Sequence, residues 1–165
     1  MSERIVKVRT RVRCWSCAER PDSVRRGADV APLFIARIPV DSREHFALLL
    51  LDARHAPMAA PLIVSTGTLN ASLVHPREVF APAIRAKAAA IIVGHNHPSG
   101  DVTPSMDDRE LTVRLDAAGE LMGVALLDHI IIAHGDIHGR IDPGAWLSMR
   151  ESGWPERPRS FPFPA

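Results

Sequence analysis

Residues 91–108 read IIVGHNHPSGDVTPSMDD, and the fold and the chemistry of the chain meet in this stretch. A run of apolar, mostly β-branched residues, typical of a buried strand, leads directly into His95 and His97. In an extended strand, residues i and i+2 point to the same side, so both imidazole rings can face one ion. The pattern therefore predicts a buried strand that ends in a pair of potential metal ligands.

The second half of the stretch predicts a turn followed by the start of a helix. Gly100 permits the turn, and Thr103 or Ser105 can cap the helix that follows. Asp107 and Asp108 then fall in the first helical turn, where the helix dipole favours a carboxylate. A carboxylate at this position can point back toward the two histidines.

Two imidazoles and one carboxylate form the ligand set of a catalytic zinc site whose fourth position is open to water. Zinc in such a site lowers the pKa of its water to roughly 7, and a nearby general base must then accept the proton. On chemical grounds either Asp107 or Asp108 could supply the carboxylate. The alternative is an ordinary pair of loop histidines that are solvated or hydrogen-bonded.

Apolar runs elsewhere predict strands that alternate with helices, which is typical of an α/β fold in a single domain. The predicted strands cover residues 45–53, 60–67, 90–94 and 124–133, with a short fifth near Ile141, and the predicted helices cover residues 29–40, 75–90 and 104–119. The segment between residues 94 and 124 is long enough to be a crossover connection between two strands.

The two ends of the chain differ from this central pattern. Residues 1–28 form a basic arm with eight basic and three acidic residues, a local charge of +5, and residues 151–165 form a proline-rich tail. The expected domain is residues 29–150. The arm could contact nucleic-acid phosphates weakly or remain solvated. Cys14 and Cys17 have the spacing of half a zinc knuckle, although two reduced thiols are the simpler interpretation.

Bulk composition restricts the broad class of protein. The chain has 165 residues, of which 46% are hydrophobic, so it can bury a core. The net charge of +1 favours neither a nucleic-acid partner nor its absence. No apolar stretch approaches the roughly 20 residues of a membrane-spanning helix. With only two cysteines, we expect a reducing, cytoplasmic location.

The spacing His95-x-His97 followed by ten residues and Asp108, with Ser105 three residues before Asp108, resembles the JAMM (MPN+) metalloprotease motif. The strings LNASLVHPREVF, VGHNHPSGDVTPSMDD and LLDHIII resemble the RadC-type branch of the JAB/MPN superfamily. The resemblance covers roughly residues 30–142. It implies a cytidine-deaminase-like mixed sheet flanked by helices, a single Zn²⁺, and amide or isopeptide hydrolysis in the active relatives.

The resemblance also implies roles for individual residues. His95 and His97 correspond to the histidine ligands, and the motif spacing selects Asp108 rather than Asp107 as the carboxylate ligand. Ser105 corresponds to the serine that helps to stabilise the oxyanion.

The motif also requires an upstream glutamate as the general base, and two candidates exist. Glu44 precedes the apolar strand, whereas Glu78 stands near a predicted helix start, where an acid has an ordinary structural explanation. We therefore favour Glu44.

Two further polar residues lie beside this motif in the predicted strands. Asn96 is expected to point away from the histidine pair and to form local hydrogen bonds. His129, inside an apolar strand, is expected to be a satisfied core residue, although it and Asp128 could orient one another.

The expected function is that of a zinc-dependent metallopeptidase acting on a protein or peptide substrate. The alternative is a RadC-like accessory factor of DNA repair or mobile elements that acts as a binding module. RadC-type proteins usually carry a helix-hairpin-helix region before the JAB domain. Residues 1–28 show no such hairpin, so we do not expect duplex binding through that module.

Overall fold

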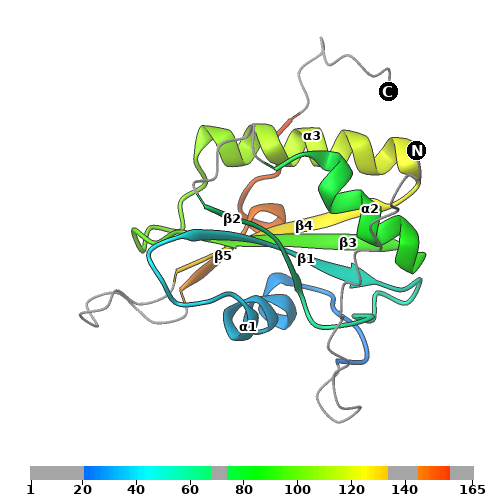
Figure 1. The fold of residues 1–165 in the computed structure, drawn as a ribbon, viewed down its shortest axis with the longest axis horizontal. Helices are drawn as coiled ribbons and strands as arrows, with labels where there is room; N and C mark the ends of the chain where they lie inside the picture. Colours follow the sequence, from blue (N-terminus) through cyan, green and yellow to red (C-terminus); the bar gives the residue numbers. More distant parts are fainter. Residues whose placement is uncertain (1–20, 68–73, 134–144, 157–165) are drawn as a thin grey trace, which may run out of the picture.

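The computed structural model describes residues 21–67, 74–133 and 145–156, which form a five-stranded mixed sheet with four helices (Figure 1). The strands are β1 (Glu44–Leu51), β2 (Leu62–Gly67), β3 (Ala90–Asn96), β4 (Ala125–Ile132) and β5 (Trp146–Ser148). The helices are α1 (Gly27–Arg37), α2 (Pro76–Ala86), α3 (Met106–Met122) and α4 (Met149–Ser152).

The strand order across the sheet is β2-β1-β3-β4-β5, so β3 lies at the centre. β1 pairs antiparallel with both β2 and β3, and β5 pairs antiparallel with β4. β3 and β4 are parallel, and α3 connects them as the predicted crossover. This single-domain α/β architecture confirms the predicted fold class.

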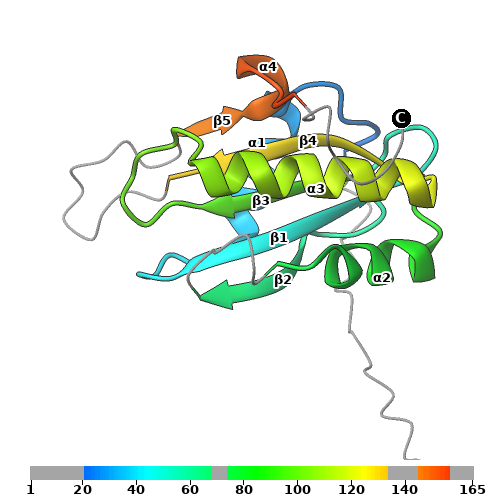
Figure 2. The ribbon, with the colours of Figure 1, turned by 90° about the horizontal axis from the view of Figure 1, so that it is seen from above.

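Helices cover both faces of the sheet, with α2 and α3 on one side and α1 on the other (Figures 1 and 2). Alternate residues of β1 and β3 supply the two cores, because successive side chains of a strand point to opposite faces. The core beneath α2 and α3 includes Phe46, Leu48, Phe80, Ile91, Val93, Leu111 and Leu115. The core beneath α1 includes Phe34, Ala47, Leu49, Ile92, Ile130 and Ile132.

A bulge in β4 changes which side chains reach the α3 face. Ile91 pairs with Leu126, whereas Ile92 pairs with Asp128, so β4 carries one extra residue, Leu127, at this point. An extra residue inverts the alternation of every side chain that follows it. As a result His129, which pairs with Val93, projects from the same face of the sheet as the odd-numbered residues of β3.

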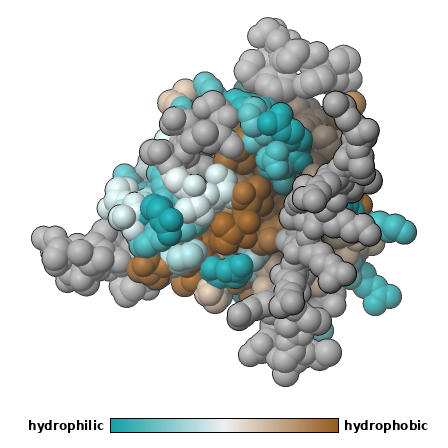
Figure 3. Space-filling model, in the orientation of Figure 1, coloured by the Kyte–Doolittle hydropathy of each residue, from teal (hydrophilic) through white to brown (hydrophobic). Residues whose placement is uncertain are grey.

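The edge strand β2 is only half-buried along most of its length. On the face shown in Figure 3, hydrophobic side chains gather at the centre, where β2 forms the edge of the sheet nearest the viewer, with hydrophilic side chains around them. Among the described residues, no helix has the length and apolar character that crossing a membrane requires.

The predicted elements before residue 134 all appear in the structure, with shifted ends. β3 continues through Asn96, two residues beyond its predicted end, so His95 belongs to the strand itself. Ser105, not Thr103, is the N-cap of α3. The predicted strand near Ile141 lies outside the described residues, and the fifth strand that the structure describes is β5.

Packing extends past residues 29–150 on both sides. Val24 is buried in the α1 core, and its amide donates to the carbonyl oxygen of His55 at 2.9 Å. The amide of Gly27 donates to Glu151 Oε1 at 2.8 Å, and Trp154 packs against the core beneath α2 and α3. These contacts support domain boundaries near residues 22 and 156, which we put forward as a proposal.

A fragment of residues 22–156 should therefore be more stable than one of residues 28–150. Loss of the Val24 side chain alone should lower the free energy of unfolding by about 1.5–3 kcal/mol, the usual value for burying such a side chain. Urea unfolding of the two fragments measures the difference. Equal stability would show that the ends contribute nothing and that the narrower boundaries are right.

Gly94 allows α1 to approach the sheet directly before His95. A Cβ atom at Gly94 would lie 2.9 Å from both Cγ and Cδ1 of Phe34, and these atoms are the base of a fully buried ring. Gly94→Ala should therefore lower the free energy of unfolding by about 1–3 kcal/mol, as overpacking does in other cores. Urea unfolding measures this loss.

The double variant Gly94→Ala/Phe34→Leu is the matched test, because the smaller leucine makes room for the added methyl group. It should lose less stability than the sum of the two single variants, since the two sites are in contact. If the losses of the two single variants are additive, the strain of Gly94→Ala does not arise from contact with Phe34.

Candidate metal centre

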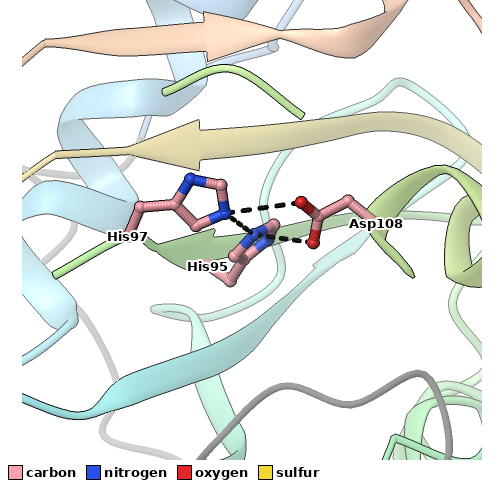
Figure 4. Close-up of side chains that lie close together, drawn as sticks. All are labelled: His95, His97 and Asp108. Atoms are coloured by element: carbon pink, nitrogen blue, oxygen red, sulfur yellow. Dashed lines mark hydrogen bonds and ion pairs between the residues drawn. The ribbon is translucent and has the colours of Figure 1, made fainter. Parts of the chain in front are cut away.

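The end of β3 and the start of α3 bring His95, His97 and Asp108 together (Figure 4). His95 Nε2 lies 3.0 Å from Asp108 Oδ1, and His97 Nε2 lies 3.4 Å from Asp108 Oδ2. The two Nε2 atoms are 2.9 Å apart. As the sequence predicted, the two rings face the same side, and the first-turn carboxylate points back toward them.

The spacing of these atoms fits a metal ion. Tetrahedral zinc binds nitrogen and oxygen at about 2.0–2.2 Å, which places neighbouring ligand atoms about 3.3 Å apart. The two Nε2 atoms are 2.9 Å apart, and each lies 3.0 or 3.4 Å from a different oxygen atom of Asp108, near this value. Electron-pair donors at this spacing need a hydrogen atom or a cation between them, and a single metal ion could satisfy all three residues at once.

A capping box holds the carboxylate of Asp108. The Ser105 amide and hydroxyl both donate to Asp108 Oδ2, at 2.7 and 2.6 Å, while the Asp108 amide donates to Ser105 Oγ at 3.1 Å. Burial alone would raise the pKa of Asp108. Hydrogen bonds from His95 and His97, the charge of His95, and the hydrogen bond from the Ser105 hydroxyl outweigh that effect and lower the pKa far below its ordinary value. The carboxyl group is therefore ionised at neutral pH.

His97 is held by its other ring nitrogen. Its Nδ1 is hydrogen-bonded to the carbonyl oxygen of Asp101, which can only accept, so Nδ1 carries the hydrogen, and Nε2 of the neutral ring can offer a lone pair to a metal ion. Burial lowers the pKa of His97, but the hydrogen bonds to Asp108 and Asp101 and the negative charges of Asp108 and Glu44 outweigh burial, and the pKa is raised.

His95 is in contact with a fully buried histidine. His95 Nδ1 lies 2.8 Å from His129 Nε2, and His129 Nδ1 lies 2.7 Å from Thr112 Oγ1. Burial, followed by the charge of His95, lowers the pKa of His129 well below its ordinary value, so this ring is neutral at pH 7. His129 is thus a satisfied core residue, as expected, but it also touches a potential ligand, which sequence reasoning missed. The β4 bulge that turns it toward His95 leaves no recognisable signal in the sequence.

Glu44 lies beside the same cluster. Phe46 pairs with His95 in antiparallel register, so Glu44, two residues earlier, lies opposite position 97. A pocket of about 340 Å³ is lined by Glu44, His97, Ser99, Ser105, Met106, Asp107 and Asp108. Glu78, the other candidate base, lies in the first turn of α2, where its carboxylate accepts a hydrogen bond from Arg77 Nε at 3.1 Å.

Asn96 fixes the chain on both sides of Glu44. The amide of His45 donates to Asn96 Oδ1 at 2.7 Å, and Asn96 Nδ2 donates to the carbonyl oxygen of Arg43 at 2.9 Å. Asn96 is 1% exposed, so water does not compete for these bonds. It does point away from the histidine pair, as expected, but its partners lie on the neighbouring strand, and the expectation of local bonds was wrong.

Larger pockets lie away from the cluster. One of about 730 Å³, lined largely by α3 and residues 153–156, shares Met106 with the pocket at the metal centre. The chemistry of the donor atoms, not the size of the cavity, identifies the site. Cys14 and Cys17 lie outside the described residues.

Together these features define the class of protein: an α/β domain whose His–His–Asp cluster can hold a metal ion. A family model described as the RadC-like JAB domain matches residues 24–154. The chain belongs to this family, and its mixed sheet is consistent with the JAB/MPN fold.

Named relatives agree with the family model. The chain is 48% identical over 126 residues to a UPF0758 protein of Rubrobacter xylanophilus, covering 76% of this chain and 51% of the relative. It is 47% identical over 117 residues to one of Staphylococcus haemolyticus, covering 71% and 51%. The chain spans about half the length of the curated relatives it matches, and their names specify a family and no reaction.

A divalent metal ion should stabilise the protein through Asp108. Zn²⁺ at about a hundred times its dissociation constant should contribute about 2.7 kcal/mol, or roughly 5–10 °C in Tm, because it binds the folded state. Asp108→Asn should abolish this shift while its amide oxygen still caps α3. Differential scanning fluorimetry with and without Zn²⁺ measures it.

Asp107→Asn is the matched control, since Asp107 lies in the same helical turn and lines the same pocket. It should keep the full zinc-dependent shift. If Asp107→Asn loses the shift and Asp108→Asn retains it, Asp107 is the carboxylate ligand.

Proposed function

We propose that this chain is a zinc-dependent hydrolase of peptide or isopeptide bonds, with His95, His97 and Asp108 as the metal ligands. The observation that carries the proposal is the convergence of His95, His97 and Asp108 at the edge of a pocket that Glu44 also lines. Family membership supports it, because the sequence resembles the JAMM motif, whose active relatives cleave amide bonds.

Zinc is the proposed ion because two imidazoles and one carboxylate are its usual catalytic ligand set. When bound, zinc would supply Lewis-acid polarisation of the scissile carbonyl group and activation of a water molecule. The chain's own residues hold the geometry that this chemistry needs. Asp101 fixes the ring of His97, and Ser105 fixes the carboxylate of Asp108.

Glu44 is the proposed general base. Its place opposite position 97 puts a carboxylate on the pocket wall, where it can take the proton of the attacking water and pass it to the leaving amine. The Asn96 bridge fixes the backbone on both sides of Glu44, so the carboxylate starts from a defined position.

Ser105 is the proposed hydrogen-bond donor to the oxyanion, because it lies on the wall of the same pocket. In the structure its hydroxyl hydrogen goes to Asp108 Oδ2. A substrate oxygen would therefore compete with that carboxylate for the donor, and the contribution of Ser105 to catalysis should be smaller than that of Glu44.

The alternative, a binding module of a DNA-repair or mobile-element factor, rests on the charge of +5 in residues 1–28. Such a module needs no general base beside a metal centre, so the presence of Glu44 in the pocket favours hydrolysis. The two cysteines of the chain are compatible with a cytoplasmic setting, which we include in the proposal.

Glu44→Gln should lower hydrolysis by a factor of about 10² or more while zinc binding persists, because general-base catalysis contributes about 10²–10⁴. The assay is cleavage of fluorogenic peptides and of lysine-linked isopeptides by the zinc-loaded protein, with metal content measured in parallel. Glu78→Gln is the control and should leave the rate unchanged. A rate that falls in Glu78→Gln and persists in Glu44→Gln would assign the base to Glu78.

A further inference from the structure

We propose that Thr112 and His129 form a hydrogen-bond relay that fixes the ring tautomer of His95 and so presents its Nε2 lone pair to the metal. Both are positioning residues, since neither faces the pocket beside Glu44. The inference rests on the proposed metal site, but each hydrogen bond of the relay lies within the chain itself.

The relay begins at the hydroxyl hydrogen of Thr112. Thr112 Oγ1 lies 2.6 Å from the carbonyl oxygen of Asp108 and 2.7 Å from His129 Nδ1, with the sulfur atom of Met149 more distant at 3.5 Å. Two oxygen atoms 2.6 Å apart repel each other unless a hydrogen atom lies between them. The carbonyl oxygen cannot supply one, so the Thr112 hydroxyl donates to Asp108.

This first step determines the remaining hydrogen positions. With its only hydrogen used, Thr112 Oγ1 must accept from His129, so His129 Nδ1 carries the hydrogen. In a neutral imidazole the other nitrogen is then an acceptor, so His129 Nε2 accepts from His95 Nδ1 at 2.8 Å. With Nδ1 used in this way, His95 Nε2, which is directed at His97 and Asp108, is the nitrogen that can give up its hydrogen and offer a lone pair to a metal ion.

The opposite arrangement has a double cost. If Thr112 donated to His129, the oxygen atoms of Thr112 and Asp108 would face each other at 2.6 Å without a hydrogen. His95 would then carry its hydrogen on Nε2, where it would occupy the position of the metal. Only the first arrangement pairs every polar atom from Thr112 to His95 Nδ1 and keeps His95 Nε2 available to a metal ion.

Because the relay is buried, each of its polar atoms needs a hydrogen-bond partner within the protein. His95, His129 and Thr112 are each 0% exposed, so water cannot replace a missing partner. The ring of Phe46 stacks beside His95, with centroids 6.2 Å apart, and meets His129 edge-on at 5.7 Å. The relay also requires the β4 bulge, because without it His129 would project from the opposite face of the sheet.

Thr112→Val and Thr112→Ser form a matched pair for the test. Valine keeps the branched shape and removes the hydroxyl group, whereas serine keeps the hydroxyl group. The measurements are the ¹⁵N NMR tautomers of His95 and His129 in metal-free protein at alkaline pH, and the Zn²⁺ dissociation constant by competition with a chromophoric chelator.

In the unchanged protein both rings should carry hydrogen on Nδ1. Thr112→Val should move the hydrogen of both rings toward Nε2 and weaken Zn²⁺ binding by about 10–100-fold, the usual effect of losing a residue that orients a metal ligand. Thr112→Ser should restore both properties. A merely structural role of Thr112 would leave the tautomers unchanged.

An Nε2-protonated His129 in the unchanged protein overturns the relay, and this measurement stands even if Thr112→Val fails to fold. Unchanged tautomers and zinc affinity in folded Thr112→Val overturn it as well. Failure of the unchanged protein to bind Zn²⁺ while both rings carry hydrogen on Nδ1 would overturn the proposed function and leave the relay supported.

Discussion

The buried carboxylate of Asp108 joins the two elements on which the site depends. It is 4% exposed, and a carboxylate at such depth is costly unless its oxygen atoms are paired. Ser105 supplies two donors from the α3 N-terminus, and His95 and His97 lie within 3.0 and 3.4 Å from the end of β3. These contacts fix the first turn of α3 against the central strand, and the crossover to β4 starts from that point.

Strand register then places every other group. Because β1 runs antiparallel to β3 and Phe46 pairs with His95, β1 begins where β3 ends, and Glu44 comes to lie beside the histidine pair. The side chain of Asn96 bridges from β3 to both neighbours of Glu44. On the other side, the parallel strand β4 brings His129 to His95 only because its bulge changes the alternation. The candidate metal centre therefore depends on the pairing of three strands.

The sequence predicted those parts of the site that depend on local rules. The His-x-His spacing, a cap at Thr103 or Ser105 and the first-turn acid each follow from local rules within one element, and the structure brings His95, His97 and Asp108 together. The partners of Asn96 lie 51 and 53 residues away, and the place of His129 depends on one unpaired residue in β4. No periodicity within a strand contains this information. The contacts of Val24 were likewise not predictable, because an isolated apolar residue in a polar segment carries no pattern.

The relay of Thr112 and His129 beneath the site is explained better by function than by stability. Thr112 and His129 lie fully buried close to the apolar core beneath α2 and α3, where aliphatic or aromatic side chains of similar volume would pack without any need for partners. Buried polar groups of this kind rarely add stability over well-packed apolar ones, and a half-satisfied network is worse than none. What the pair adds is a defined hydrogen position on His95, because each donor in the chain has one acceptor and the series ends at the backbone of Asp108. His95 on β3 and Asp108 on α3 thus share one hydrogen-bond network. The position of the Asp108 carbonyl oxygen constrains which ring nitrogen of His95 carries the hydrogen.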